Sequence, residues 1–492
     1  MATSAMTPVP FQAEHVQALA LRGHGDLNSA SYELFRITDA PAARGWLGAI
    51  ADRVSYLETE KQDKREASPA RRKTRLQVAL TAQGMAELGL KAHLATFPIE
   101  FQLGMAARAH ALGDERDEIQ SWDYGSGNKP IHVMLLLFAG TDEEVAAFAR
   151  AEIEEAERRG LTHFATQTTL RYESKDRIFE HFGFRDGLVQ PSIDLEGHSV
   201  RADDGTPGPD PSHKVPLGEV VLGQLNAYKY RTIGPSVPNS LDARGFLPDF
   251  LSSGRKDLGA HGTYLVLRKL EQDVAGFWLA IDRAAESLGV DPEWLAAKMV
   301  GRWKNGSAVV NHPNEPGPPP VKDTPGISFA SDRHGFRCPV GAHIRRSNPR
   351  DDLGDDVGKS LELVGRHRLI RRGRVYGPRL ADSRKDDGKK RGLVFITVGA
   401  SIRRQFEFVQ NLWVTNTTFR GLNGEDDPVV GPRCPAFFGA GKSTHAEQTS
   451  PFSLQAHPVQ SVVPALPRFV TMRGGDYFFL PSVPALRFIA AL

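Results

Sequence analysis

The sequence predicts an α+β fold made of two similar units, and three observations support it. The chain has 492 residues, more than the roughly 100–200 residues of one ordinary domain. Strand-like and helix-like segments follow each other in order, and the same order starts again after a Gly/Pro-rich stretch near 205–245. No repeat is visible residue by residue, so the duplication rests on element order alone.

The first unit opens with a strand over 30–37, after which Asp39 caps a helix whose apolar residues recur at helical spacing. A second strand, over 74–81, precedes a short helix. A third strand, over 131–138, is almost wholly apolar, which indicates burial on both faces. These segments predict a sheet partly covered by helices.

The first unit continues with a strong helix over 142–159. Thr141 is its expected N-cap, acidic residues fill its first turn and arginines its last, as the helix dipole favours. A strand over 162–171 follows. The result is a split β-α-β arrangement with one large insertion.

The second unit repeats this order, and we place the boundary near residue 235, giving domains 10–235 and 236–492. Residues 312–326 are too rich in proline for regular structure and predict a loop. The expected elements are a strand over 263–269, a helix beginning at Asp273, a helix opened by Asp291-Pro292, a central strand over 392–398 and a helix over 401–413.

Composition excludes several classes of protein. Hydrophobic content is 40%, charged content 24%, and 61 basic residues against 59 acidic ones leave a net charge of +2, which favours neither nucleic acid nor a membrane surface as a partner. The two cysteines, Cys338 and Cys434, lack metal or redox spacing and are expected to be reduced structural thiols. Without a secretory signal or an apolar stretch of about 18 residues, we expect a cytoplasmic protein.

Three short motifs contain residues that could carry chemistry. Gly-Phe-Arg-Asp-Gly, 183–187, presents Asp186 between two glycines, although an Asp in this setting is usually a turn residue. His343 lies among four arginines in 337–350; a neutral imidazole can ligate iron and arginines can hold haem propionates, although a structural histidine is the commoner case. The segment 367–377 contains Arg371 and also fits a basic surface strand.

The order of these motifs resembles that of the dye-decolourising (DyP-type) peroxidases. The resemblance extends to 101–109, 406–413 and 468–482, and so covers nearly the whole chain, which is similar to the larger members of the family. It implies two ferredoxin-like domains with antiparallel sheets. Haem b, one iron per chain, would lie between distal and proximal segments and be held mainly by the second domain.

The resemblance also implies roles for individual residues. His343 matches the proximal iron ligand, and Asp186 and Arg371 match the catalytic pair on the distal side; Arg372 is adjacent and should point to the opposite face of a strand. Three further cofactor-binding residues are expected: Arg350 near a propionate, and Leu393 and Phe395 on the distal wall. A carboxylate should support the histidine, and Glu425, Asp426 and Asp427 are all candidates.

The expected function is reduction of hydrogen peroxide to water, coupled to one-electron oxidation of dyes, phenols or other aromatic donors. Asp186 would move the peroxide proton, and Arg371 would stabilise the departing oxygen. Because bulky dyes would not fit the pocket, Tyr376, Trp413 and Tyr477 are candidates for relaying electrons from the surface.

Other functions stay open at this point. A haem-binding protein of the same fold without peroxidase activity is the main alternative, and a binding module without cofactor is another. The Gly-Ala-Gly-Lys-Ser-Thr segment, 439–444, suggests a phosphate-binding loop, but Ala436 stands where that loop needs glycine. The oligomeric state and the physiological reductant are not predicted.

Overall fold

The computed structural model describes residues 7–56, 74–114, 116–170, 172–174, 177–195, 214–251, 253–320, 326–433 and 449–492. Its centre is a nine-stranded sheet with strand order β13-β15-β12-β18-β2-β3-β1-β4, in which β14 also pairs with β15. The pairs of this sheet are antiparallel, as expected.

The first half of the sheet has the ferredoxin-like strand order 4-1-3-2. Asp39 caps α2 by accepting a hydrogen bond from Ala42 N, and Thr141 and Glu144 form a capping box at the start of α6. Both predicted caps are therefore confirmed. The elements are β1 (Ser29–Ile37), α2 (Ala40–Ala51), β2 (Thr74–Leu80), β3 (Val133–Ala139), α6 (Asp142–Arg158) and β4 (Leu161–Thr169).

The second half repeats this order, and β13 and β14 together take the place of the second strand of the unit in chain order. The strand predicted over 392–398 is β15, which is flanked on both sides but lies near one end of the sheet. The helix predicted over 401–413 is wound as two π-helical segments, Ile402–Glu407 and Val409–Val414. The other elements are β12 (Thr263–Gln272), α7 (Val274–Leu288), α8 (Pro292–Val300), β13 (Ile370–Arg371), β14 (Arg374–Tyr376), β15 (Gly392–Gly399) and β18 (Val470–Leu480).

The two halves meet where β18 pairs with β2, with Phe479 opposite Leu80. On one face of the sheet, alternate side chains such as Phe35, Val266 and Phe479 form a core with the covering helices. On the other face, neighbours such as Leu34 and Leu265 pack against the N-terminal segment and residues near Val220. Alternation along the strands thus gives the sheet two apolar faces.

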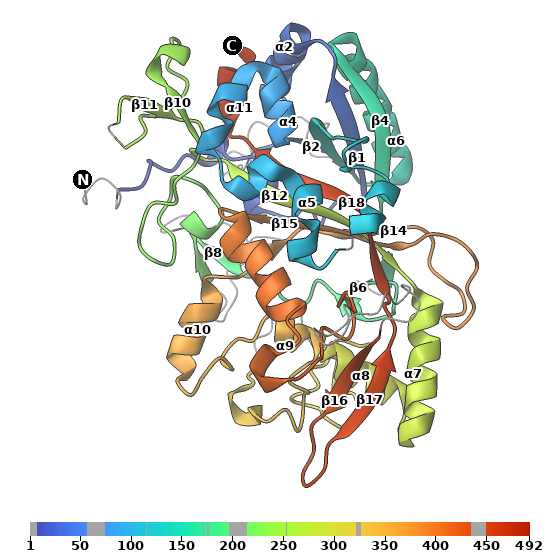
Figure 1. Cartoon of the computed structure of the whole chain (residues 1–492). Coiled ribbons are helices and arrows are strands. Elements are labelled where there is room, and N and C mark those ends of the chain that lie inside the picture. The colour runs from blue at the N-terminus through green and yellow to red at the C-terminus, as the bar shows by residue number, and fades with distance from the viewer. Residues whose placement is uncertain are drawn as a thin grey trace.

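The remaining elements lie mostly around and below the sheet as seen in Figure 1, where α7, α8, α9 and the β16–β17 hairpin form the lower part. The helices are α1 (Ala18–Leu21), α4 (Ala82–Met85), α5 (Ile99–Leu112), α9 (His343–Ser347), α10 (Val357–Gly365) and α11 (Val483–Ala490). The strands are β5 (Tyr172–Ser174), β6 (Arg177–Phe179), β7 (Arg185–Asp186), β8 (Ser192–Asp194), β9 (Lys214–Pro216), β10 (Ser236–Pro238), β11 (Arg255–Asp257), β16 (Ser450–Leu454) and β17 (Ser461–Leu466).

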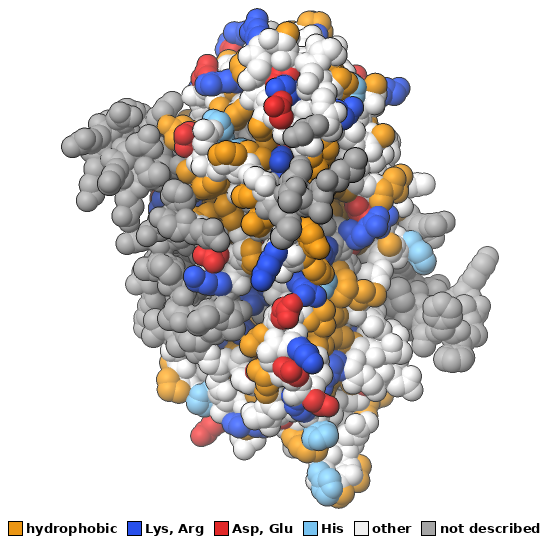
Figure 2. All heavy atoms as spheres, turned by 90° about the vertical axis from the view of Figure 1, so that its left-hand side faces the viewer, with side chains coloured by type: hydrophobic (Ala, Val, Ile, Leu, Met, Phe, Trp, Pro, Cys, Tyr) orange, Lys and Arg blue, Asp and Glu red, His pale blue; other side chains and the backbone are white. Residues whose placement is uncertain are grey.

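The surface and the cysteines agree with the composition. Figure 2 shows a face on which basic and acidic side chains are interspersed among hydrophobic and uncharged ones. Cys338 is a buried free thiol, and burial raises its pKa to about 12, whereas Cys434 and the segment 439–444 lie outside the described residues. No helix within the described ranges is both long and apolar enough to cross a bilayer.

Candidate active site

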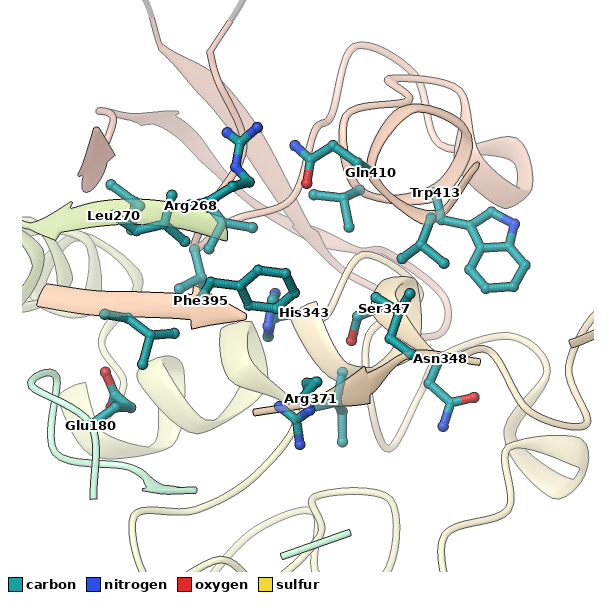
Figure 3. Close-up of a pocket in the computed structure, with 18 of the residues that line it drawn as sticks. Glu180, Arg268, Leu270, His343, Ser347, Asn348, Arg371, Phe395, Gln410 and Trp413 are labelled. Carbon is teal, nitrogen blue, oxygen red and sulfur yellow. The ribbon is translucent and has the colours of Figure 1, made fainter. Parts of the chain in front are cut away.

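A cavity of about 360 Å³ lies against the second half of the sheet. Its walls come from β12, β15 and β18, from the π-helical segment Val409–Val414, from α9, and from two first-half segments, the end of α5 and the loop 180–191. His343, Arg371 and Phe395 face this same space (Figure 3). The volume falls within the range usual for small-molecule and cofactor sites.

His343 begins α9 and points into the cavity. Its side chain is 31% exposed, and it lines the cavity wall. Its Nδ1 lies 2.9 Å from Oδ2 of the fully buried Asp427. Burial lowers the pKa of His343, but the charge and hydrogen bond of Asp427 outweigh burial and leave that pKa raised. With Nδ1 engaged, Nε2 is the nitrogen whose lone pair can bind a metal.

Asp427 is therefore the carboxylate that supports His343. The sequence had left the choice among Glu425, Asp426 and Asp427 open. Its Oδ1 accepts hydrogen bonds from Val429 N at 2.9 Å and Val430 N at 3.0 Å. Burial raises the pKa of Asp427, but His343, the Val430 N–H and Arg346 reverse this effect, so the pKa is lowered.

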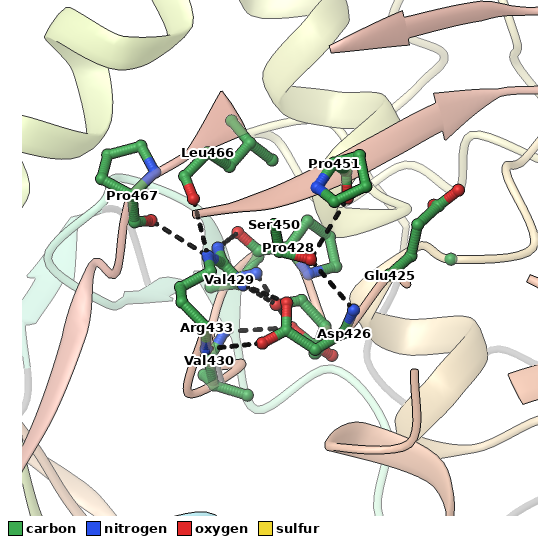
Figure 4. Close-up of polar contacts among 12 residues, drawn as sticks. Glu425, Asp426, Pro428, Val429, Val430, Arg433, Ser450, Pro451, Leu466 and Pro467 are labelled. Carbon is green, nitrogen blue, oxygen red and sulfur yellow. Dashed lines mark hydrogen bonds and ion pairs between the residues drawn. The ribbon is translucent and has the colours of Figure 1, made fainter. Parts of the chain in front are cut away.

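The two neighbouring acids have other partners. Asp426 binds Arg433, whose Nη1 donates to Oδ1 at 2.6 Å and whose backbone N donates to Oδ2 at 2.7 Å (Figure 4). Arg433 also donates to the Asp427 and Pro428 carbonyls. Glu425 accepts from the backbone N and the hydroxyl of Ser453. These contacts hold the loop so that only the Asp427 carboxylate meets His343.

Asp186 lies in β7, a two-residue strand that pairs with β6. Gly183 and Gly187 on either side have φ angles of +96° and +68°, which favour glycine. The Asp186 Oδ1 accepts a hydrogen bond from Gly187 N at 2.6 Å, which is one residue on and not the two residues on of an Asx turn. The side chain is 37% exposed and lines the cavity.

Arg371 reaches the cavity from β13 and meets Asp186. The Arg371 Nη1 lies 3.6 Å from Asp186 Oδ1, and Arg371 Nη2 donates to Val189 O at 3.3 Å. Gln190 bonds the backbone N and O of Arg371, joining the two segments further. Arg372 is buried and its Nε donates to Leu19 O instead, as expected for adjacent residues with opposite directions.

Leu393 and Phe395 both line the cavity. They lie two apart on β15 and pair in register with Leu270 and Arg268 of β12. Between them Val394 is fully buried on the other face. The two side chains therefore lie on one wall of the cavity.

Arg350 also lines the cavity, with a left-handed backbone at φ +56°. Arg302, which the sequence analysis missed, lies in the same wall and donates to Gly306 O at 2.7 Å. Burial, and then the charges of Arg350 and Arg371, lower the pKa of Arg302 to about 10. This end of the cavity thus concentrates positive charge.

Two arginines beside His343 do not serve the cavity. Arg345 and Arg346 are fully buried; Arg345 binds Asp352 and the Cys338 carbonyl, and Arg346 donates to the carbonyls of Trp413, Asn416 and Glu425. Neither side chain lines the cavity, because α9 turns both into the protein interior.

The three aromatic residues expected to relay electrons from the surface are buried. Tyr376 and Trp413 are each 6% exposed and Tyr477 is fully buried, so none of them can contact a bulky dye at the surface. Trp413 lines the cavity instead, and the Tyr477 hydroxyl donates to Glu407 at 2.8 Å. Large aromatic side chains are mostly core residues, and these three follow that rule.

Two further groups in the wall escaped the sequence analysis. Arg268 pairs with Asp114 through bonds of 2.6 and 2.8 Å. It lies two residues from both Val266 and Leu270 on β12, so the alternation of a strand could have placed it on the same face as these apolar residues. Glu180, three residues before Gly183, lines the cavity and is half-buried among backbone donors, and no pattern in the sequence marks it.

These residues fit a haem. An imidazole supported by a carboxylate faces an apolar wall, and a cluster of arginines at one end matches the charge of propionates. Opposite charges at Asp186 and Arg371 lie in the same cavity. The arrangement can hold a metal through nitrogen while a carboxylate and a guanidinium act on a small bound molecule.

Comparison with known proteins agrees with this geometry. Residues 27–173 match the family model of the DyP dimeric alpha+beta barrel domain. The chain is 30% identical over 474 residues to the multifunctional dye peroxidase DyP2 of Amycolatopsis sp., covering 91% of this chain and 90% of that protein. It is 27% identical to the dye-decolorizing peroxidase msp1 of Mycetinis scorodonius, covering 94% and 85%.

A solved structure shares the fold. A dye-decolorizing peroxidase in complex with 2,6-dimethoxyphenol superposes with a TM-score of 0.75 at 23% identity, covering 98% of this chain and 100% of that chain. At that identity the match supports the architecture described above and not the roles of individual residues.

Proposed function

This chain belongs to the DyP-type peroxidase family and is a peroxidase, and we propose that its cavity binds haem b through His343 and reduces hydrogen peroxide with Asp186 and Arg371. The observation that carries the proposal is the meeting of Asp186 and Arg371, 3.6 Å apart, in the cavity that His343 also lines. We further propose one haem per chain and two domains, 10–235 and 236–492, that both contribute to its walls.

His343 would hold the iron through Nε2 because Nδ1 is bound to Asp427. The buried carboxylate orients the ring and increases electron donation by the imidazole. Arg350 and Arg302 would meet the propionates, and Leu393 and Phe395 would cover the distal side. When bound, the haem would supply the electrons that peroxide accepts and recover them singly from a reductant.

Asp186 and Arg371 would have different tasks. The Asp186 carboxylate can accept the proton of the peroxide oxygen nearer the iron and return it to the farther oxygen, which leaves as water. Arg371 presents a fixed positive charge where the leaving oxygen gathers negative charge. Gln190 and Val189 keep the Arg371 segment against the loop of Asp186, so the two groups act at one place.

Small aromatic donors are the reductants that this site supports best. One structural relative holds 2,6-dimethoxyphenol, and the cavity of this chain has an apolar wall beside polar groups. Dyes too large for the cavity would need another point of electron entry, and the three buried aromatic residues named above do not provide one. A haem-binding role without peroxidase activity is not favoured, because the relatives are peroxidases.

Reconstitution with haem tests the proposal. Purified protein should bind one equivalent of haem b, show the absorption spectrum of histidine-ligated iron, and oxidise 2,6-dimethoxyphenol only when peroxide is added. A protein that binds haem but does not consume peroxide would contradict the roles of Asp186 and Arg371. A protein that takes up no haem would contradict the assignment of the cavity.

A further inference from the structure

The carboxyl group of Glu180 closes the loop that presents Asp186. Its Oε1 accepts a hydrogen bond from Phe184 N at 2.8 Å, and its Oε2 accepts one from Phe182 N at 2.9 Å. The Glu180 backbone N also donates to Phe184 O at 3.1 Å. The Glu180 side chain and these backbone bonds therefore hold the shape of residues 180–184, which lead directly into Asp186.

The same carboxyl group joins this loop to the second half of the chain. Gln272, the last residue of β12, donates through Nε2 to Glu180 Oε2 at 2.8 Å. The Gln272 Oε1 is buried and has no hydrogen-bond partner within the described part of the chain. A buried amide oxygen without a partner has a free-energy cost, so a nearby donor would be favoured there.

Protonation of Glu180 would supply that donor. An ionised carboxylate can only accept, and it then takes the Gln272 N–H, as in the structure. A neutral carboxyl group can donate its O–H, and rotation of the Gln272 amide would bring Oε1 to receive it. The proton comes from and returns to solvent, and no other group needs to change charge.

We propose that Glu180 is a positioning residue for Asp186, and that its protonation, matched by the Gln272 amide, switches the loop between two hydrogen-bonded states. The inference rests on the proposed role of Asp186 as the proton carrier. Neutral Glu180 leaves Asp186 as the single negative charge of this loop end, beside Arg371. Ionised Glu180 adds a second one, and like charges in a partly buried site repel, which would weaken the placement of Asp186 beside Arg371.

The surroundings of Glu180 support a titration near neutral pH. Burial raises the pKa of Glu180 to about 7 against the effect of its three donors, and the charge of Asp186 raises it further. Other groups of the same wall include His343, whose own pKa is raised by Glu180, and Arg371, which pairs with Asp186. The remaining titratable or charged side chains of that wall are Asp114, Glu118, Arg185, Arg268, Arg302, Arg350, His367, Arg368 and Arg468. Gln272 on β12 is uncharged, so no cation contacts the Glu180 carboxyl among the described residues.

The test combines infrared titration with rapid mixing. The carbonyl band of a protonated carboxyl group should titrate with a midpoint near pH 7 and disappear in Glu180→Gln, with or without haem. In the haem-loaded parent, the rate of the first absorbance change with peroxide should fall about 5-fold as pH rises through that midpoint, the scale of one hydrogen bond. Glu180→Gln, neutral at every pH, should keep the faster rate throughout.

Gln272→Leu provides a second route should Glu180→Gln lose haem. It removes a donor that favours ionised Glu180, so the infrared midpoint and the kinetic inflection should move to higher pH together. Asp476→Asn is the matched control: burial raises the pKa of Asp476 to about 6, its two backbone bonds go to Oδ1, which Asn retains, and it lies outside the cavity wall.

Asp476→Asn should remove a separate infrared band and leave the kinetic inflection in place. The proposal fails if Glu180→Gln retains the infrared band or the inflection, or if Gln272→Leu shifts one without the other. Absence of any peroxide reaction in the parent would instead contradict the proposed function, while the infrared titration would still report on Glu180.

Discussion

Two carboxyl groups near His343 and Asp186 have nearly the same backbone contacts but opposite pKa shifts: Asp427, buried behind His343, and Glu180, half-buried in the cavity wall. Asp427 and Glu180 each accept two backbone N–H bonds, from Val429 and Val430 in one case and from Phe182 and Phe184 in the other. Burial is the largest influence on both. Nevertheless, the pKa of Asp427 is lowered, whereas that of Glu180 is raised to about 7.

The third partner and the nearby charges make the difference, since Asp186 raises the pKa of Glu180 and Arg346 lowers that of Asp427. Asp427 meets the His343 imidazole, which can carry positive charge, whereas Glu180 meets the neutral amide of Gln272. Two backbone donors alone do not compensate for the desolvation of a carboxylate, but a cationic partner added to them does. The carboxylate of Asp427, behind the proposed metal ligand, is therefore kept ionised. The carboxyl group of Glu180, near the proposed proton carrier, can change between its ionised and neutral forms.

Removing His343 should have the largest effect, because it takes away both the iron ligand and the partner of Asp427. His343→Ala should lose haem or its normal absorption spectrum and abolish peroxide turnover. His334→Ala is the control, since His334 is exposed and lies outside the cavity wall. A normal histidine-ligated spectrum in His343→Ala would refute the assignment.

Changes at the proton-moving wall should slow the reaction without removing haem. Asp186→Ala should reduce the rate of reaction with peroxide by about 10²–10⁴-fold, as for loss of a proton carrier, and Arg371→Leu by roughly 10²–10³-fold, as for loss of one electrostatic donor. Stopped-flow absorbance measures both.

Chemical rescue separates these two roles, since their ranges overlap. Small carboxylates or weak bases can replace a proton carrier but not a fixed guanidinium, so they should restore Asp186→Ala more than Arg371→Leu. If Asp186→Ala reacts at the parent rate without rescue, Arg371 is the dominant group and Asp186 is not the essential carrier.

Neutralising Asp427 should have a smaller effect, because Asn can keep Oδ1 for the two backbone donors. Asp427→Asn should weaken haem affinity or activity by about 10–100-fold, the usual scale for a carboxylate behind a ligating histidine. Haem titration followed by absorbance measures the affinity. Glu425→Gln tests the choice among the neighbouring acids and should leave haem affinity close to that of the parent.

The smallest expected effect is on stability against pH. The pKa of Glu180 is raised from 4.5 to about 7 in the folded protein, so between these values the folded state keeps a proton that the unfolded state releases. Stability contributed by this group therefore falls as pH rises through that interval. The free energy of unfolding of Glu180→Gln, relative to the parent, should rise from pH 4.5 to 7 and then level off; a constant difference would show that Glu180 does not titrate there.

Local patterns were sufficient for most of the elements. The caps predicted at Asp39, Thr141 and Asp291 are all present, because a cap depends on residues within one turn. The helix expected to begin at Asp273 starts at Val274, with Asp273 as its cap. The helix expected over 401–413 exists, but its π-helical winding was not foreseen. Apolar spacing shows which face is buried and not how the backbone hydrogen bonds are offset.

The sequence by itself determined the strand and helix order, the caps, and the three motifs that contain Asp186, His343 and Arg371. Only the tertiary structure decided that Asp427 and not its neighbours meets His343, that Arg345 and Arg346 turn inward, and that Glu180 belongs to the cavity wall. The reason is physical: propensity and capping act between residues close in the chain, whereas the direction of a loop side chain depends on partners far away in sequence. For the Asp427 side chain that partner is His343, and for the Glu180 side chain it is Gln272.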